Sequence, residues 1–170
     1  MQNYFELFSL EVDFSIDLAQ LETHYQQQVA QYHPDKFASK SDKEKTQALQ
    51  NTALLNTAFE TLKAPLSRAT YLLELEGINA FDEKDTQMDM DFLIGQIALR
   101  EELESIQSSQ DELALDDFIE TISDKVSSSI AQIQQLFIDN ELSQIKNCVR
   151  ELKFYTQLKR QANQLMDEWL

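Results

Sequence analysis

The fold of this chain of 170 residues is decided by one short stretch, Gln31-Tyr32-His33-Pro34-Asp35-Lys36-Phe37. Pro34 cannot continue a helix, because its ring clashes with the preceding turn and its nitrogen carries no hydrogen to donate. On both sides of the stretch apolar residues recur at spacings of three and four, which predicts two amphipathic helices. The stretch is therefore expected to form a rigid turn that exposes an imidazole and a carboxylate between antiparallel helices.

Polar side chains mark where the helices begin. Asp17 is followed three residues later by Gln20, and Ser41 by Glu44, so each pair has the spacing of a capping box at a helix N-terminus. Asn3 can cap a short helix that is too apolar to stand alone and must pack on another element. The first part of the chain is therefore expected to be a short helix followed by a helical hairpin.

Two helix-interrupting residues divide the rest of the chain. Pro65 suits the first position of a fourth helix, where its missing N–H costs nothing, and Gly77 is expected to end that helix. The stretch 77–88 is polar and has little periodicity, so it is expected to be a linker.

Three more helices are expected after the linker. One lies near 89–107, and two long ones are separated by a turn at Asp139 and Asn140. The prediction is an all-α protein with one domain at 1–76, a linker at 77–88 and a three-helix bundle at 89–170.

The composition restricts the classes of partner and chemistry. A formal net charge of -16 repels nucleic-acid phosphates and anionic lipid headgroups, so neither nucleic acid nor a membrane is an expected partner. The chain has no long apolar segment and no basic-then-apolar leader, so a cytoplasmic protein is expected. Cys148 is the only cysteine, and His24 and His33 lack companion ligands at metal-binding spacing. No metal site and no cofactor are expected.

Several motifs together resemble the J domain, and in particular its HscB branch. The first is the turn quoted above after a short apolar helix, and the second is Leu55-Asn56 before Ala58-Phe59 in the next helix. The third is the run Leu62-Lys63-Ala64-Pro65-Leu66-Ser67-Arg68-Ala69-Thr70-Tyr71-Leu72-Leu73, which is similar to HscB proteins, as is the helical tail. The resemblance covers essentially the whole chain, and it implies an N-terminal J domain followed by a C-terminal three-helix bundle.

The resemblance implies a co-chaperone that stimulates ATP hydrolysis by a DnaK-class (HscA-type) chaperone. The residues that it implies as chaperone contacts are Tyr32, His33, Pro34, Asp35 and Lys36. No residue is expected to be catalytic, because the sequence has no nucleophile, metal cluster or phosphate-binding glycine loop beside the histidine and the carboxylate. The chain is therefore expected not to be an enzyme.

One feature departs from the J-domain pattern. J domains commonly carry a basic stripe on the helix before the turn, whereas this chain has no lysine or arginine between Asp17 and Tyr32. Either the four lysines at positions 36, 40, 43 and 45 supply this charge, or they are the solvated start of the next helix.

The helix near 89–107 has two apolar faces. One face carries Phe92, Leu99, Leu103 and Ile106 and is expected in the core of the bundle. The second carries Met90, Leu93, Ile94 and Ile97, continued by Glu101 and Glu104, and it either packs under the first domain or stays exposed as a binding face. Phe154 lies off the apolar seam of the last helix and is expected to project onto the same side.

In the HscB family this part of the bundle binds the iron–sulfur scaffold protein IscU. By that resemblance the scaffold-binding residues are Leu93, Ile94, Ile97, Glu101, Glu104 and Phe154. Ala98 and Ser105 stand where relatives often have acids, so part of the acidic contact is expected to be reduced or moved to Glu104.

The sequence also allows three alternatives to a scaffold-specific co-chaperone. A general-folding J protein would need a glycine-rich or zinc-bearing client region, which this sequence lacks. A helical adaptor with a vestigial His-Pro-Asp turn would leave the ATPase rate of any chaperone unchanged. A helical enzyme would turn over a substrate by itself.

Overall fold

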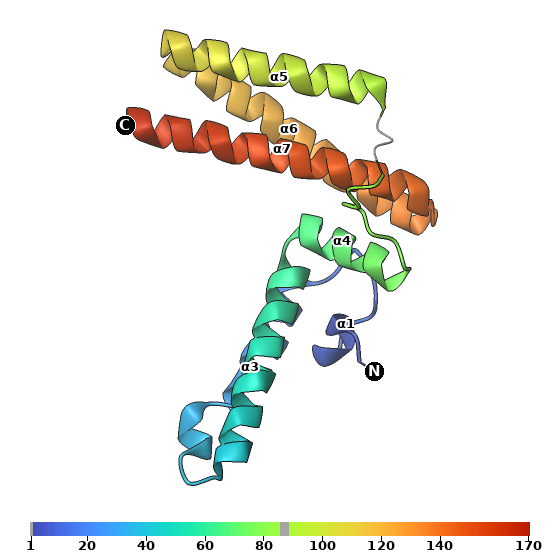
Figure 1. The fold of residues 1–170 in the computed structure, drawn as a ribbon, viewed down its shortest axis with the longest axis vertical. Coiled ribbons are helices and arrows are strands. Elements are labelled where there is room, and N and C mark those ends of the chain that lie inside the picture. The colour runs from blue at the N-terminus through green and yellow to red at the C-terminus, as the bar shows by residue number, and fades with distance from the viewer. Residues whose placement is uncertain (1, 86–88) are drawn as a thin grey trace. The chain divides into compact units, whose positions relative to one another are not determined.

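The computed structural model describes residues 2–85 and 89–170, and every regular element in these ranges is a helix (Figure 1). The chain divides into two compact units, Met1–Glu76 and Gly77–Leu170. The expected all-α fold is confirmed.

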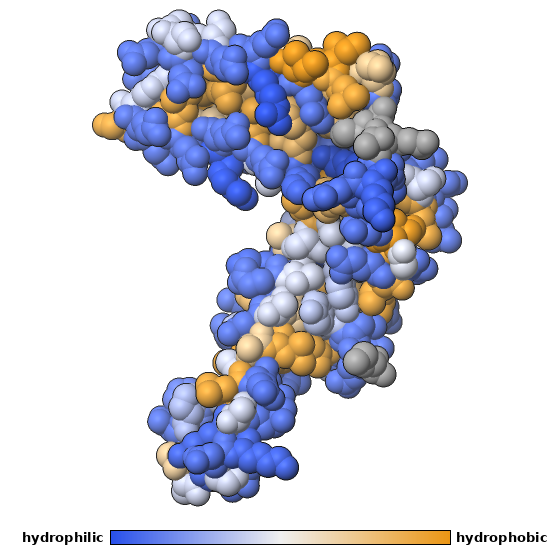
Figure 2. Space-filling model, viewed as in Figure 1, coloured by the Kyte–Doolittle hydropathy of each residue, from blue (hydrophilic) through white to orange (hydrophobic). Residues whose placement is uncertain are grey.

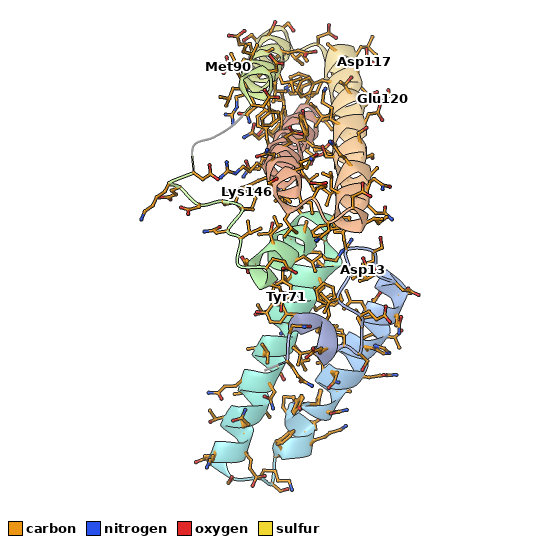
Figure 3. All side chains as sticks on the ribbon, turned by 90° about the vertical axis from the view of Figure 1, so that its right-hand side faces the viewer. Asp13, Tyr71, Met90, Asp117, Glu120 and Lys146 are labelled. Carbon is orange, nitrogen blue, oxygen red and sulfur yellow. The ribbon has the colours of Figure 1, made fainter. Side chains whose placement is uncertain are left out.

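The first unit is a helical hairpin with a short helix at each end of the sequence. Its elements are α1 (Tyr4–Leu7), α2 (Leu18–Gln31), the 3₁₀ helix η1 (Pro34–Phe37), α3 (Asp42–Lys63) and α4 (Pro65–Leu75). α2 and α3 lie side by side, with η1 in the turn that joins them (Figure 3). Pro65 occupies the first turn of α4, and Gly77 follows its end with a φ of 79°, a backbone conformation that favours glycine.

Side-chain caps fix the start of the helices. Asn3 and Glu6 form a full reciprocal capping box at α1. Asp17 accepts a hydrogen bond from the backbone N–H of Gln20 at α2, and Ser41 does the same for Glu44 at α3. The predicted N-termini of α2 and α3 are therefore confirmed, although the described contacts there are one-sided caps.

The core of the first unit joins all four of its α-helices. Its largest fully buried side chains are Phe5 and Phe8 from the α1 region, Leu21 from α2, Leu62 from α3 and Leu73 from α4. Tyr71 of α4 stacks on Tyr4 with ring centroids 4.5 Å apart, and its hydroxyl accepts a hydrogen bond from the Tyr4 backbone N–H (Figure 3). The short apolar helix therefore packs on α4, as its composition requires.

The second unit is a bundle of three helices, α5 (Met90–Ser109), α6 (Glu112–Ile138) and α7 (Leu142–Trp169). α6 and α7 form a long hairpin, and α5 contacts both of them (Figure 1). Asn140 makes the tight turn between α6 and α7 with a φ of 56°, which confirms the turn expected at Asp139 and Asn140. Leu103, Ile106, Phe118, Ile122 and Leu158 belong to the buried core that joins the three helices.

The segment before α5 packs on α7 of the same unit. The side chain of Arg150 donates from Nε to the carbonyl oxygen of Ala80 (2.7 Å), and Ala80 is fully buried. Asp85 pairs with both Lys146 and Arg150. We call residues 79–85 the strap; they form part of the stretch 77–88 expected as a linker, of which residues 86–88 lie outside the described residues.

Candidate functional site

The turn between α2 and α3 presents its histidine and its carboxylate in different ways. Nδ1 of His33 accepts a hydrogen bond from the backbone N–H of Asp35 (3.2 Å), so His33 caps η1. The same nitrogen lies 3.6 Å from Oδ2 of Asp35. Because Nδ1 accepts the hydrogen bond from the backbone N–H, it carries no proton that it could donate to the carboxylate. The Asp35 side chain is 93% exposed. The imidazole therefore shapes the turn, and the carboxylate is available to a partner.

An apolar groove lies against this turn. Pro34 opens η1, and the rings of Tyr32 and Phe37, before and within η1, are stacked with centroids 6.4 Å apart. Together with residues of α3 they line a cavity of about 300 Å³, whose walls are Tyr32, Pro34, Phe37, Ala38, Lys45, Ala48 and Leu49. The exposed turn and this groove form one continuous surface, because Pro34 belongs to both.

The motifs quoted for the family resemblance hold the first unit together. The hydroxyl of Tyr25 on α2 donates to Oδ1 of Asn56 on α3, and the Tyr25 ring stacks on Phe59 at 4.1 Å. Ser67 donates to the carbonyl oxygen of Thr61 (2.7 Å) at the corner between α3 and α4. These residues fix the hairpin that presents the turn.

Arg68 is the buried charged residue of this corner. Its Nη1 donates to the carbonyl oxygen of Leu62 (2.8 Å), and its guanidinium lies over the Phe14 ring, 4.9 Å from the centroid. Only 7% of the residue is exposed, and burial lowers the pKa of the guanidinium from its usual value. Arg68 therefore joins α3, α4 and the loop before α2.

In the second unit α5 carries an exposed apolar face. Met90, Ile94 and Ile97 are 67%, 59% and 59% exposed, and Leu93 beside them is half-buried. Figure 2 shows hydrophobic residues gathered over the first half of α5. We call Met90, Leu93, Ile94 and Ile97 the α5 face.

The opposite side of α5 packs in the bundle core. Leu103 and Ile106 are buried there, and Phe92 and Leu99 pack against the same cluster. This confirms the expected core stripe. Glu101 and Glu104, which follow the α5 face along the helix, are also exposed.

Phe154 does not belong to the exposed α5 face, contrary to the expectation from its place off the α7 seam. It is only 6% exposed and lies in the bundle core. Its ring meets Phe92 edge-on at 5.8 Å, and the Arg100 guanidinium covers it at 5.3 Å. α7 has a second buried stripe because it packs on α5 as well as on α6.

Comparisons with known proteins agree over both units. Residues 3–71 match the DnaJ domain family, and residues 88–163 match the family described as the HSCB C-terminal oligomerisation domain. The co-chaperone protein HscB homolog of Aliivibrio fischeri (strain MJ11) is 38% identical over 99% of this chain and 99% of its own length. This chain belongs to the HscB co-chaperone family.

Solved HscB structures share the fold of the whole chain. The chaperone HscB from Vibrio cholerae is 36% identical, with a TM-score of 0.89 over 99% of this chain and 100% of its own. The human co-chaperone protein HscB is 28% identical, with a TM-score of 0.87 over 96% of this chain and 81% of its own. In this HscB-family chain the first unit is therefore a J domain, and the second is the C-terminal helical domain of the family.

The HscB-family chain offers no metal centre within its described residues. No group of three or more histidine, cysteine, aspartate or glutamate side chains is placed to hold an ion in residues 2–85 and 89–170. Cys148 is buried in α7, and burial, with the charge of Glu151, raises the pKa of its thiol to about 11. None of the described helices is both long and apolar enough to cross a membrane.

Acidic pairs that suggest acid–base chemistry do not converge on a common point. Glu101 and Glu102 are both exposed on α5, as are Asp116 and Asp117 on α6. Figure 3 shows Asp117 and Glu120 on the outer side of α6. These carboxylates form solvated faces.

Part of the groove beside the turn was not predicted from the sequence. Leu49 of α3 is 66% exposed and lines the groove next to the buried Ala48. A leucine among polar neighbours on the outer side of a helix was the available signal. Leu49 therefore extends the surface that the motif alone defined.

Proposed function

We propose that this protein delivers an IscU-type iron–sulfur scaffold protein to an HscA-type chaperone of the DnaK class and stimulates the ATPase activity of that chaperone, in support of iron–sulfur cluster transfer. The observation that carries the proposal is the pairing of two surfaces in one chain. One is the J-domain turn with an exposed Asp35 carboxylate, and the other is the exposed apolar α5 face.

The J-domain turn is suited to docking rather than to bond-making chemistry. Asp35 is ready to accept hydrogen bonds or an ion pair, while His33 and Pro34 fix the backbone around it. A carboxylate whose backbone is already fixed loses less conformational freedom on binding than one on a mobile loop. We propose Tyr32, His33, Pro34, Asp35 and Lys36 as chaperone contacts, with Asp35 as the main one.

The α5 face is suited to binding a folded protein. Contiguous exposed apolar side chains with a polar border are typical of protein interfaces, where the apolar centre supplies affinity and the border supplies orientation. We propose Leu93, Ile94 and Ile97 as the apolar contacts of the scaffold, and Glu101 and Glu104 as its acidic border. Phe154 lies in the bundle core and contacts the ring of Phe92 on α5, so its proposed role is to hold α5 in place and is indirect.

The two surfaces act together because one chain carries both. When the J domain holds the chaperone and the bundle holds the scaffold, each partner is present near the other at a high effective concentration. Capture of the scaffold by the chaperone is then accelerated without any new contact between them. The chain itself makes and breaks no bond.

The test measures steady-state ATP hydrolysis by a DnaK-class chaperone with this chain, with and without the scaffold protein. Asp35→Asn is expected to abolish the stimulation, because it removes the exposed charge without disturbing the turn. The double variant Ile94→Asp/Ile97→Asp is expected to keep the stimulation by the chain alone but to lose the additional increment from the scaffold.

Leu113→Asp is the matched control for the double variant, since Leu113 is 80% exposed on α6 of the same unit. It is expected to behave as the wild type. If the wild-type chain leaves the ATPase rate unchanged in both mixtures, the co-chaperone function is refuted and a helical adaptor takes its place. If Leu113→Asp and the double variant lose the increment equally, the α5 face is not the scaffold site.

A further inference from the structure

The second helix of this J domain has no lysine or arginine to offer a partner. α2 contains no lysine or arginine, and its single histidine, His24, donates from Nδ1 to the carbonyl oxygen of Phe8. The exposed polar side chains along α2 include four amides and an acid: Gln20, Gln26, Gln27, Gln31 and Glu22. α2 therefore offers a partner hydrogen bonds but no lysine or arginine side chain.

Positive charge is concentrated instead between the turn and the start of α3. Four lysines occur there within ten residues of a chain whose net charge is -16: Lys36, Lys40, Lys43 and Lys45. All four are exposed, and none of them takes part in an ion pair within the described part of the chain. Their charge is therefore directed to the solvent.

Two of these lysines lie where their charge does not stabilise α3. Lys43 and Lys45 lie in the opening turn of the helix, where the helix dipole favours acids such as Asp42 and Glu44 and disfavours cations. A local arrangement that works against its own helix, with no compensating ion pair among the described residues, is expected at functional sites. An external partner is the better explanation for these lysines.

The apolar groove lies among these charges. Lys45 lines it together with Pro34 and Phe37 on one side and Ala48 and Leu49 on the other. Leu49 is 66% exposed, so the groove is open to a partner. A surface with an apolar centre and a cationic border fits an acidic protein surface that carries an apolar side chain.

We propose that the electrostatic part of the chaperone-docking surface lies on the start of α3 and not on α2, and that the chaperone presents an acidic surface whose apolar side chain enters the groove beside Pro34 and Leu49. This inference rests on the proposed function and specifies where the partner binds. The lysines attract the acidic surface over a distance, and the groove retains it after contact. Long-range attraction mainly raises the association rate, while a filled apolar groove mainly slows dissociation.

The test of the charges measures association of the full-length chain with the chaperone by stopped flow over a series of salt concentrations. The triple variant Lys40→Gln/Lys43→Gln/Lys45→Gln is expected to associate about tenfold more slowly at low salt, with a weaker dependence on salt. The control triple Lys63→Gln/Lys84→Gln/Arg160→Gln changes the net charge by the same amount at exposed positions elsewhere. It is expected to change the association rate by less than about twofold.

Thermal unfolding separates docking from a structural role. The Lys40/Lys43/Lys45 triple is expected to be at least as stable as the wild type, because cations are removed from the N-terminal end of the α3 dipole. A loss of stability that accompanies the slower association overturns the inference, since the lysines then act on the fold.

The test of the groove uses Leu49→Asp, with Leu18→Asp as the matched control. Leu18 is 52% exposed at the other end of α2, so both variants place an acid at an exposed leucine of the J domain. Leu49→Asp is expected to accelerate dissociation of the chaperone at least fivefold, and Leu18→Asp to leave it within about twofold.

Besides a loss of stability, three results overturn the inference. The first is association of the Lys40/Lys43/Lys45 triple at the rate of the control triple, and the second is equal dissociation rates for the two leucine variants. If the wild type stimulates the chaperone in these two cases, the proposed function stands, and only the placement of the docking surface on the start of α3 is wrong. The third is the absence of any binding by the wild type, which refutes the proposed function as well.

Discussion

His33 and Asp35 are two residues apart but differ in their structural roles. The imidazole Nδ1 is occupied by the backbone N–H of Asp35, and the carboxylate is almost fully exposed. A substitution of His33 is therefore expected to act through the shape of the turn, whereas a substitution of Asp35 removes a direct contact. The two side chains do not exchange a proton in this geometry, which supports the recognition role proposed for them.

Arg68 is expected to be the most sensitive charged residue of the J domain. Arg68→Ala leaves the buried carbonyl oxygen of Leu62 without its donor and removes the stacking on Phe14. We expect a loss of about 2–3 kcal/mol in the free energy of unfolding of the J domain. Urea unfolding followed by tyrosine absorbance measures it, because four of the five tyrosines lie in residues 1–76.

Lys63→Ala is the control for Arg68→Ala. Lys63 is an exposed residue of α3 whose ion pair with Glu60 is solvated. Such a pair contributes about 0–1 kcal/mol, so the control is expected to unfold close to the wild type. Equal stability losses in the two variants would contradict the role assigned to Arg68.

Cys148 is expected to be unreactive and to make stability sensitive to alkaline pH. Burial raises the pKa of its thiol to about 11, so at pH 8 the folded protein holds almost no thiolate. As the pH rises above the unfolded pKa of about 8.5, the unfolded state loses this proton first. The free energy of unfolding of the wild type therefore falls between about pH 8.5 and pH 11, relative to Cys148→Ala.

Two measurements check the prediction for Cys148. Iodoacetamide at pH 8 is expected to label the denatured chain rapidly and the native chain very slowly. Denaturant unfolding of wild type and Cys148→Ala across the alkaline range gives the pH dependence. Rapid labelling of the native protein would show that the thiol is accessible and refute both expectations.

At the scale of single residues the sequence was informative where local geometry decides the outcome. Pro34, Pro65 and Gly77 act through their own backbone, so their positions predicted the turn, the start of α4 and its end. Phe154 was placed wrongly, because its burial depends on which side of α7 meets α5. Phe154 lies in one buried cluster with Leu158, Ala162 and Leu165, and its place there follows only from the packing of the three helices.

At the scale of the elements the two faces of α5 were predictable and the packing of the strap was not. On a helical wheel of α5, the angular positions of the residues place Leu103 and Ile106 on a different face from Ile94 and Ile97. Residues 79–85 have the polar composition of a linker, yet Arg150 of α7 binds Ala80 across seventy positions of sequence. Hydrogen bonds at such separation leave no periodic signal, so composition could not indicate them.

The strap is expected to contribute measurably to the stability of the second unit. Arg150→Ala removes the hydrogen bonds to the carbonyl oxygens of Ala80 and Asp85 and leaves the Asp85 carboxylate with Lys146. We expect a loss of about 2 kcal/mol in the free energy of unfolding. Fluorescence of Trp169, the only tryptophan, reports this unit in urea unfolding.

Arg160→Ala is the matched control for Arg150→Ala, since Arg160 is exposed on the same helix. A change of less than about 0.5 kcal/mol is expected for it. If Arg150→Ala were as stable as Arg160→Ala, the strap would be a loosely attached segment rather than part of the unit.

At the scale of the whole molecule the proposed function depends on having both surfaces in the same chain. Neither the J-domain turn nor the α5 face couples the scaffold to the ATPase cycle by itself. The gain comes from the effective concentration that a covalent connection provides, and this gain vanishes when the surfaces lie on separate molecules. The proposal therefore predicts that two full-length chains with complementary defects cannot replace one intact chain.

A mixing experiment measures this coupling. One chain carries Asp35→Asn, which leaves the α5 face intact, and the other carries Ile94→Asp/Ile97→Asp, which leaves the turn intact. An equimolar mixture is expected to show the basal stimulation of the second chain but none of the additional increment from the scaffold. Recovery of the full increment at low micromolar concentrations would mean that the two surfaces act independently, or through association of copies, and that bivalency within one chain is not the mechanism.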